Sequence, residues 1–340
     1  MPVATRGMAA LKRAAEAGTR PARILAADVG GTHARFFCGR ATGKPLHLET
    51  SDFHDLNALV RAALNKFGAH AWGEFDLALA VAGPVHGDRA RFTNLSWDAD
   101  AAALQKHFGF RQVLLLNDLE VAARALAEHP PADAAMLRRG VASGARMAVI
   151  SIGTGLGTAF WTHYEGALHI EPAEAGHVGF APSESWQLDY LKVLQQRYGQ
   201  RISWERVLSG PGLALLDAHL RNGNITTAAD VAHRAAAGDS AAVTALRRFS
   251  RMLGTYAGDL VLAAASHGGV WLIGGVLAGL GPLFDTQEFL EGFDDKGRLA
   301  PIMENVPVHR TDAGDLGVRG AWLAALGGHH AYRRELWASA

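Results

Sequence analysis

The chain alternates short apolar runs with longer amphipathic stretches. Apolar runs predict buried strands at 24–28, 75–81, 113–116, 147–152 and 270–273. Between them, apolar residues recur at three- and four-residue spacing, and this spacing predicts helices. Because strands and helices alternate in two successive halves, the pattern predicts an α/β protein with two lobes and a cleft between them. The predicted helices cover 56–67, 98–108, 119–128, 186–198, 227–237, 240–266 and a last segment near 319–326.

Two of the predicted strands end in glycine-rich turns and then reverse direction. The strand at 24–28 leads into the turn Asp28-Val-Gly-Gly-Thr32 and a returning strand at 34–38. The strand at 147–152 leads into Gly153-Thr-Gly-Leu-Gly157 and a returning strand at 158–161. Both segments are hairpins rather than strand-to-helix loops, and their repetition indicates a duplicated building block.

The glycines of these turns suit a phosphate group. A residue without a Cβ reaches positive φ and lets backbone N–H groups approach an anion, and the hydroxyls of Thr32, Thr154 and Thr158 are further donors. A single such turn is commonly an ordinary β-hairpin, but two in matching context predict a phosphate held from both sides of the cleft. A third glycine pair, Gly274-Gly275, follows the strand at 270–273, and by itself could be any close-packed turn.

Other phosphate-binding motifs fit less well. No stretch matches the Walker pattern G-x-x-x-x-G-K-[ST]. The segment 153–158 departs from G-x-G-x-x-G because Thr158 stands at the position of the last glycine.

Composition narrows the functional classes. A chain of 340 residues is long enough for two domains. Lys and Arg together number 33, as do Asp and Glu, so no overall basic excess favours nucleic acid or a membrane surface. A single cysteine, Cys38, excludes an intrachain disulfide and a zinc site built on several thiolates, and we expect a cytoplasmic protein with a buried structural thiol. Residues 1–23 lack the apolar core of a secretory signal and are expected to form a flexible extension.

Several polar residues are candidates for chemistry. Asn117 and Asp118 follow the strand at 113–116, where parallel strands commonly present ligand contacts, although both residue types are also preferred helix caps. Glu174 and His177 are three residues apart among small residues that leave the backbone open to a ligand. The same segment could equally be a solvated loop. Glu205 precedes a Gly-Pro-Gly turn and could equally belong to the first turn of a helix capped by Ser203. Asn94 and Trp97 fit a turn former and a core aromatic residue.

Taken together, these segments resemble the bacterial glucokinases, members of the superfamily that includes hexokinase, actin and the Hsp70 ATPase. The resemblance runs from about Ile24 to Gly328 in conserved motif order, through 28–32, 93–97, 117–118, 153–157, 174–177, 205–212 and 274–275. It implies the two-lobed actin-like ATPase fold, related to ribonuclease H, with an interdomain cleft. It also implies a small α/β domain at 24–128 with 319–340, and a large α/β domain at 129–318. The cysteine-rich zinc motif of the related ROK sugar kinases is missing, which places the chain in the zinc-free glucokinase branch.

The resemblance also implies roles for individual residues. Asp118 would be the general base that takes the proton from the 6-hydroxyl of glucose, and Asp28 would orient Mg²⁺ through its waters. The glycine turns would hold the phosphates of ATP, and Gly274-Gly275 would lie against the adenosine. The implied sugar contacts are Asn94, Asn117, Asp118, Glu174, His177 and Glu205, and the implied ATP contacts are Ala27, Asp28, Val29, Gly30, Gly31, Thr32, Gly153, Thr154, Gly155, Gly157, Gly274 and Gly275.

Alternative functions keep the same fold. An enzyme of this kind could accept fructose, mannose or an amino sugar, because Leu119 and Gly179 stand where the family often has phenylalanine and an acidic residue. A sugar sensor or an assembly protein without catalysis would keep the nucleotide turns and lose the acidic cluster. Related enzymes are commonly dimers, so a homodimer is expected by resemblance.

Overall fold

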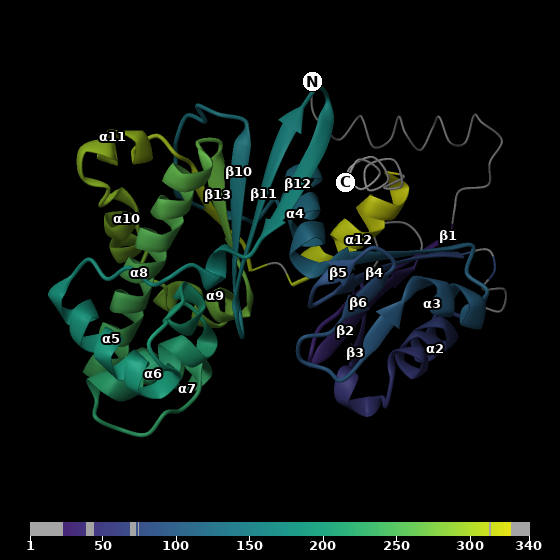
Figure 1. Ribbon diagram of the computed structural model, residues 1–340, viewed down its shortest axis with the longest axis horizontal. Coiled ribbons are helices and arrows are strands. Elements are labelled where there is room, and N and C mark those ends of the chain that lie inside the picture. Colours follow the sequence, from purple (N-terminus) through teal and green to yellow (C-terminus); the bar gives the residue numbers. More distant parts are fainter. Residues whose placement is uncertain (1–22, 39–43, 69–72, 74, 313, 328–340) are drawn as a thin grey trace. The chain divides into compact units, whose positions relative to one another are not determined.

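The computed structural model describes residues 23–38, 44–68, 73, 75–312 and 314–327 (Figure 1). The chain divides into two compact units, 1–130 with 315–340 and 131–314. Unit 1 resumes at residue 315, a few residues before the predicted domain boundary between 318 and 319. The last helix likewise begins at Leu316 rather than near Arg319. The expected flexible extension lies outside the described residues, apart from Arg23, which is the first residue of a strand.

Unit 1 is built on a five-stranded sheet. Its order is β3-β2-β1-β4-β8. β2 pairs antiparallel with both β1 and β3, whereas β1, β4 and β8 run parallel, so the carboxyl ends of these three strands meet at one edge. The strands are β1 (Arg23–Val29), β2 (His33–Cys38), β3 (Leu46–Glu49), β4 (Phe75–Val81) and β8 (Gln112–Asn117).

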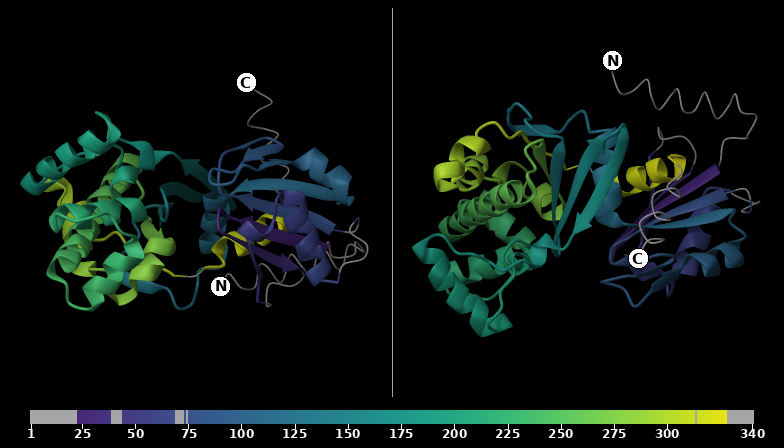
Figure 2. Two further views of the ribbon diagram at one scale, coloured as in Figure 1. Left: turned by 90° about the horizontal axis from the view of Figure 1, so that it is seen from below. Right: turned by 45° about the horizontal axis from the view of Figure 1, so that its top comes forward.

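Helices cover both faces of this sheet. Leu25 and Ala27 of β1 lie in one core with α2 (Leu56–Lys66) and α3 (Ala101–Phe108). Ile24 and Ala26 lie in a second core with α4 (Asp118–Glu128) and α12 (Leu316–Leu326). Alternate residues of a strand point to opposite faces, so the nearly continuous apolar run of β1 fills both cores. Figure 2 shows α12, the last described helix, beside β1 of the same unit.

A small second sheet changes one prediction in unit 1. The helix expected from Asp98 begins at Ala101, because 98–100 form a short strand and the carboxylate of Asp100 caps the helix by accepting from the Ala103 N–H. The remaining elements of unit 1 are η1 (Thr50–Asp52), β5 (Val85–His86), β6 (Arg89–Arg91) and β7 (Asp98–Asp100).

Unit 2 repeats the sheet of unit 1. Its order is β12-β11-β10-β13-β14-β9, in which β12, β11 and β10 pair antiparallel and β10, β13 and β14 run parallel. The first five positions have the same order and directions as the sheet of unit 1, which confirms the predicted duplication. β9 adds an antiparallel edge. The strands are β9 (Ala135–Arg138), β10 (Arg146–Ile152), β11 (Leu156–Tyr164), β12 (Ala167–Ala173), β13 (Gly269–Ile273) and β14 (Val308–Arg310).

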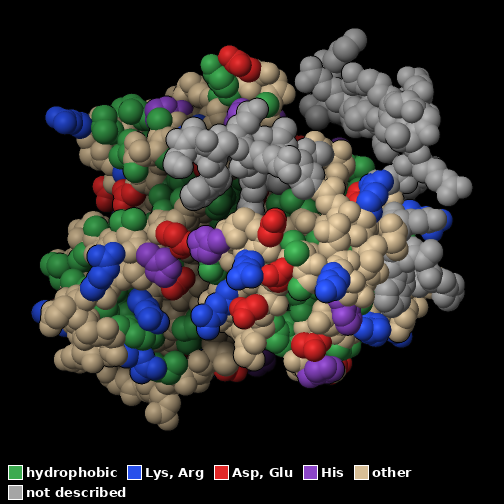
Figure 3. All heavy atoms as spheres, turned by 45° about the vertical axis from the view of Figure 1, so that its right-hand side comes forward, with side chains coloured by type: hydrophobic (Ala, Val, Ile, Leu, Met, Phe, Trp, Pro, Cys, Tyr) green, Lys and Arg blue, Asp and Glu red, His purple; other side chains and the backbone are tan. Residues whose placement is uncertain are grey.

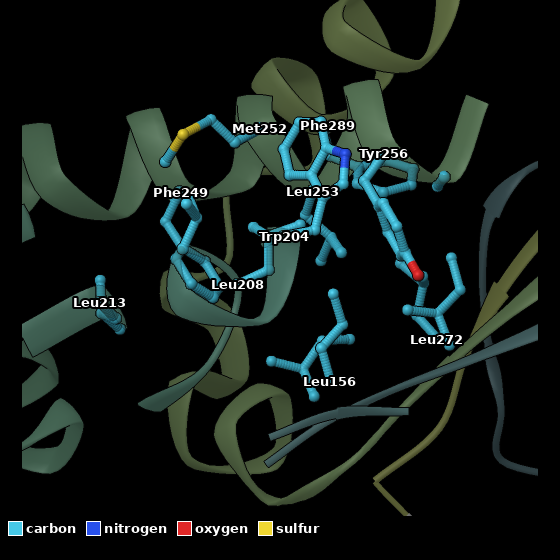
Figure 4. Packing of buried hydrophobic residues seen from close by; sticks show 14 of the residues in the cluster. Leu156, Trp204, Leu208, Leu213, Phe249, Met252, Leu253, Tyr256, Leu272 and Phe289 are labelled. Carbon is cyan, nitrogen blue, oxygen red and sulfur yellow. The ribbon is translucent and has the colours of Figure 1, made fainter. Parts of the chain in front are cut away.

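A long central helix organises the core of unit 2. Phe249, Leu253 and Tyr256 of α8 pack with Leu156 and Trp204 (Figure 4). Because Leu156 belongs to the second glycine turn, this core holds that turn in place. The helices are α5 (Ser185–Tyr198), α6 (Gly210–Leu220), α7 (Ala228–Ala236), α8 (Ser240–Ala264), α9 (Gly275–Leu280), α10 (Thr286–Asp294) and α11 (Ala300–Met303), with the short η3 (Ala175–His177), η4 (Trp204–Arg206), η5 (Gly281–Leu283) and η6 (Gly297–Leu299).

Acidic and basic side chains are interspersed on the face shown in Figure 3. Among the described helices, none has the length and apolar character needed to cross a membrane.

Cys38 is half-buried, whereas a fully buried thiol was expected. This partial burial raises the pKa of its thiol, which disfavours the nucleophilic thiolate.

Candidate active site

The first glycine turn, at the end of β1, is held by residues distant in sequence. A Cβ at Gly31 would lie 2.7 Å from the Cβ of Asn94, so only glycine allows Asn94 to pack there. The fully buried Thr50 donates its hydroxyl to the Gly31 carbonyl at 2.8 Å and its N–H to the Thr32 carbonyl at 2.9 Å. Since the C=O and N–H of a peptide unit point in opposite directions, this bonding aims the Thr32 N–H away from Thr50.

Asp28 lies one residue before the end of this strand, in a confined position. Its carboxylate lies 3.8 Å from Nη1 of Arg35 and against Gly317 of α12, where a Cβ would be 2.5 Å from Asp28 Cγ. Burial raises the pKa of Asp28 to about 6, and the charge of Arg35 opposes this rise. A cation bound beside the Asp28 carboxylate would lower this pKa and stabilise the ionised form.

Asn117 and Asp118 lie where β8 passes into α4. Asn117 is the N-cap: its Oδ1 accepts from the Leu119 and Glu120 N–H groups at 3.0 and 3.2 Å, and its Nδ2 donates to the Gly83 carbonyl at 3.2 Å. The expected capping role is thus confirmed, and it leaves Asn117 one amide hydrogen for a ligand. This bonding holds the next residue, Asp118, at the edge of the sheet.

The carboxyl group of Asp118 has an unusual acidity. Its Oδ1 accepts from the Leu119 N–H at 2.9 Å. Burial first, and the nearby carboxylate of Asp28 second, raise the pKa of Asp118 to about 7. A carboxylate with a pKa near neutrality can both accept and release a proton at physiological pH, as a general base requires.

Asn94 and Trp97 belong to the turn after β6. Trp97 is buried and meets Phe92 edge to face with ring centroids 6.1 Å apart, which confirms a core aromatic residue. Asn94 is exposed and lies against Gly31. Its amide is thus next to the first glycine turn.

The second glycine turn, between β10 and β11, receives contacts from three other motifs of unit 2. The Leu156 N–H donates to Oε2 of Glu205 at 3.2 Å, and the Gly210 N–H donates to the Gly153 carbonyl at 2.9 Å. A Cβ at Gly176 would overlap the Leu156 carbonyl oxygen. Gly274 has φ of 113° and faces the backbone of Ile152, so this position also requires glycine.

Glu174, His177 and Glu205 come together beside this turn. Nε2 of His177 is 3.7 Å from Oε2 of Glu174, and Nδ1 is 4.0 Å from Oε1 of Glu205. Their loops pair through the Trp204 N–H to Val178 carbonyl bond at 3.0 Å. The cluster combines acceptor oxygens with a ring nitrogen, which suits neighbouring hydroxyl groups. Ser203 makes no side-chain capping bond, so Glu205 lies in a short 3₁₀ turn rather than at the start of a capped α-helix.

One predicted phosphate donor is wrong. Thr158 is 1% exposed, and its hydroxyl is 2.8 Å from the hydroxyl of Tyr256 in the core. By contrast, the side chains of Thr32 and Thr154 are on the surface. Ala27 and Val29 are fully buried, so only their backbone groups are available to a ligand.

The predicted site residues thus form two groups, each within one unit. Sequence reasoning missed Thr50, Gly83 and Gly317, which brace Gly31, Asn117 and Asp28. Gly317 lies two residues after Asp315, the N-cap of α12. Neither Gly317 nor Thr50 carries a local sequence pattern that points to the site. Unit 1 contributes Ala27, Asp28, Val29, Gly30, Gly31, Thr32, Asn94, Asn117 and Asp118, and unit 2 contributes Gly153, Thr154, Gly155, Gly157, Glu174, His177, Glu205, Gly274 and Gly275.

Comparisons with known proteins show similarity in sequence and in fold. A family model described as Glucokinase matches residues 25–327. A glucokinase of Chromohalobacter salexigens is 36% identical over 315 residues, covering 89% of this chain and 97% of that protein. The crystal structure of a glucokinase from an Antarctic psychrotroph superposes with a TM-score of 0.78 at 27% identity, covering 91% of this chain and all of that one. A glucokinase from Balamuthia mandrillaris in complex with glucose has the same fold, with a TM-score of 0.74 at 20% identity over 92% of this chain and 95% of that one.

Proposed function

Because this chain belongs to the glucokinase family, we propose that it transfers the γ-phosphoryl group of ATP to the 6-hydroxyl of glucose, giving glucose 6-phosphate and ADP. Its two units repeat one sheet, as in the actin-like ATPase fold of sugar kinases. The observation that carries the proposal is the carboxyl group of Asp118, held at a helix N-terminus beside Asp28 with a pKa of about 7.

Asp118 is the general base in this reaction. The sugar hydroxyl gives its proton to the Asp118 carboxylate while its oxygen bonds to the γ-phosphorus of ATP. The bond between that phosphorus and the β–γ bridging oxygen breaks, and ADP leaves. General-base help is worth about 10²- to 10⁴-fold, whereas positioning and charge stabilisation carry most of phosphoryl transfer.

Each unit carries residues that we propose as sugar contacts. In unit 2, Glu174, His177 and Glu205 accept hydrogen bonds from sugar hydroxyls. His177 lies 3.7 Å from Glu174 and 4.0 Å from Glu205 beside the second glycine turn. In unit 1, Asn94 and the remaining amide hydrogen of Asn117 are the proposed contacts to sugar hydroxyls. The arrangement recognises vicinal hydroxyls, and a hexose other than glucose is the alternative substrate.

Each glycine turn is a proposed binding site for phosphates of ATP. The backbone N–H groups of Gly31, Thr32, Thr154 and Gly155 are the proposed phosphate donors, because those of Gly30, Gly153 and Leu156 already donate within the protein. Gly275 leaves room for the adenosine, since a Cβ there would meet no atom within 4 Å. The hydroxyls of Thr32 and Thr154 add donors.

Asp28 fits a hydrated magnesium ion. Its oxygens are hard ligands, and Mg²⁺ is commonly held by one or two carboxylates together with waters and substrate phosphates. The glycine at 317 leaves the Asp28 carboxylate its space. When bound there, the ion would neutralise charge on the phosphates. Among the described residues, no cluster of three His, Cys, Asp or Glu forms a separate metal site.

The assay that tests this function measures ADP release by the purified protein with ATP and Mg²⁺, with and without glucose, beside Asp118→Asn. We expect glucose-dependent ADP that is lost in the variant. Turnover with fructose, mannose or an amino sugar but not with glucose would reassign the substrate, and silence with every sugar despite ATP binding would favour a sensor.

We propose a cytoplasmic homodimer that supplies glucose 6-phosphate to glycolysis. Light scattering on the eluted protein measures the subunit number, and fractionation of cells measures the location.

A further inference from the structure

The Leu156 peptide of the second glycine turn lies between both loops that carry sugar-binding residues. Its N–H donates to Oε2 of Glu205 at 3.2 Å. Its carbonyl oxygen lies against Gly176, where any Cβ would overlap it. The side chain of Leu156 packs in the same core as Trp204, the neighbour of Glu205 in the chain (Figure 4). The turn and the two loops therefore cannot move independently.

The carboxylate of Glu205 lies against Gly155 in the second glycine turn. A Cβ at Gly155 would lie 2.6 Å from Oε2 of Glu205, whereas a Cβ at Gly153 would meet no atom within 4 Å. The same chain segment holds the start of the turn, because the Gly210 N–H bonds the Gly153 carbonyl. A Cβ at 155 would therefore displace the Glu205 carboxylate from its present position.

The two oxygens of Glu205 serve different neighbours. Oε2 accepts from the Leu156 N–H, while Oε1 lies 4.0 Å from Nδ1 of His177. A carboxylate has about four acceptor positions, so Glu205 can keep its bond to the turn while it accepts from a sugar hydroxyl. Its side chain is 29% exposed, which leaves it accessible to such a hydroxyl.

We propose that Glu205 is a positioning residue that couples the binding of sugar to the binding of the ATP phosphates; this rests on the proposed function. A sugar hydroxyl bonded to Glu205 orders the carboxylate and hence the Leu156 N–H, so the turn loses less freedom when it binds phosphate. The hydroxyl that donates to Glu205 also disperses part of the negative charge of this carboxylate. The repulsion between Glu205 and phosphates bound at the turn is therefore weaker. Both effects have the same sign, and each ligand raises the affinity for the other by an equal factor.

The test measures the dissociation constant of glucose by calorimetry, with and without saturating AMPPNP and Mg²⁺. Glu205→Asp keeps the charge but shortens the reach to Leu156. Glu174→Asp is the matched control, because Glu174 belongs to the same cluster but its side chain is 90% exposed. We expect AMPPNP to tighten glucose binding by about 5-fold or more in the wild type and in Glu174→Asp, but by less than about 2-fold in Glu205→Asp.

A pair of glycine variants tests the same contact without nucleotide. Gly155→Ala displaces the Glu205 carboxylate, so we expect weaker glucose binding although residue 155 belongs to the phosphate turn. Gly153→Ala, two residues away in that turn, should leave the glucose dissociation constant unchanged in the absence of nucleotide.

The outcomes separate the coupling from the function. A wild-type enzyme that phosphorylates glucose but binds it equally well with and without AMPPNP would overturn the coupling alone. Full coupling in Glu205→Asp, equal loss in Glu174→Asp, or an unchanged glucose affinity in Gly155→Ala would do the same. A wild-type protein that neither binds nor phosphorylates glucose would overturn the proposed function and this inference with it.

Discussion

The carboxylate of Asp28 lies against the backbone of Gly317, a residue nearly three hundred positions later in the chain, so that a Cβ at 317 would be 2.5 Å from Asp28 Cγ. The contact joins the end of β1 to the first turn of α12. α12 belongs to unit 1 because Val318, Ala321 and Ala324 pack in one of its cores, and the first turn of this helix thereby lies against the predicted magnesium ligand.

Gly317→Ala should therefore slow turnover by displacing Asp28, although alanine favours a helix over glycine by up to about 1 kcal/mol. We expect kcat to fall at least about 10-fold, with half-maximal activity at a higher Mg²⁺ concentration. The measurement is kcat across a magnesium titration. In the double variant with Asp28→Asn the Gly317→Ala change should add little, because the two act through one group; additive losses would contradict this account.

Asp118→Asn should fold normally and turn over at least about 100-fold more slowly, because asparagine cannot accept the proton. In the wild type, only the ionised carboxylate is active, and the pKa of Asp118 is about 7. We therefore expect kcat/KM to rise with pH through about 7 and then level off. Near wild-type turnover in a folded Asp118→Asn protein would refute its role as the base.

The same pKa predicts a pH-dependent effect on stability. Burial raises the pKa of Asp118 from 3.8 to about 7 in the folded protein. Between these values the folded state holds a proton that the unfolded state has released, so raising the pH through this window lowers stability. Asparagine does not titrate. The melting temperature of Asp118→Asn relative to wild type should increase between pH 5 and pH 8 by a few degrees or more; a difference that is constant with pH would contradict the raised pKa.

Thr50 offers a test of how the first glycine turn is held. Thr50→Val removes the hydroxyl that bonds the Gly31 carbonyl, whereas Thr50→Ser keeps it. We expect Thr50→Val to raise the KM for ATP about 5-fold or more while the glucose KM changes little, because a lost hydrogen bond in a buried site costs roughly 1 kcal/mol or more. Steady-state kinetics with each substrate varied makes the comparison, and failure of serine to restore the ATP KM would assign the effect to packing instead.

Much of the fold was predictable because local patterns agree with the tertiary structure. The apolar run of β4 matches its predicted bounds, and Asn117 and Asp118 were placed correctly at a strand-to-helix junction. The errors have physical causes. Asp98–Asp100 join a small sheet instead of a helix, and the Thr158 hydroxyl turns into the core to meet Tyr256. In the first case pairing with β6, shortly before in the chain, overrode the helical pattern, and in the second a partner distant in sequence drew the hydroxyl into the core.

The sequence by itself determined the duplicated hairpins, the glycine turns and the identity of the acidic and imidazole groups, because these depend on periodicity and on residue chemistry. Only the tertiary structure decided which groups meet. The burial that shifts the pKa of Asp118, the contact of Asp28 with Gly317 and the shared carboxylate of Glu205 all join segments far apart in the chain. Such relationships arise from packing and loss of solvent, which no local pattern of residues records.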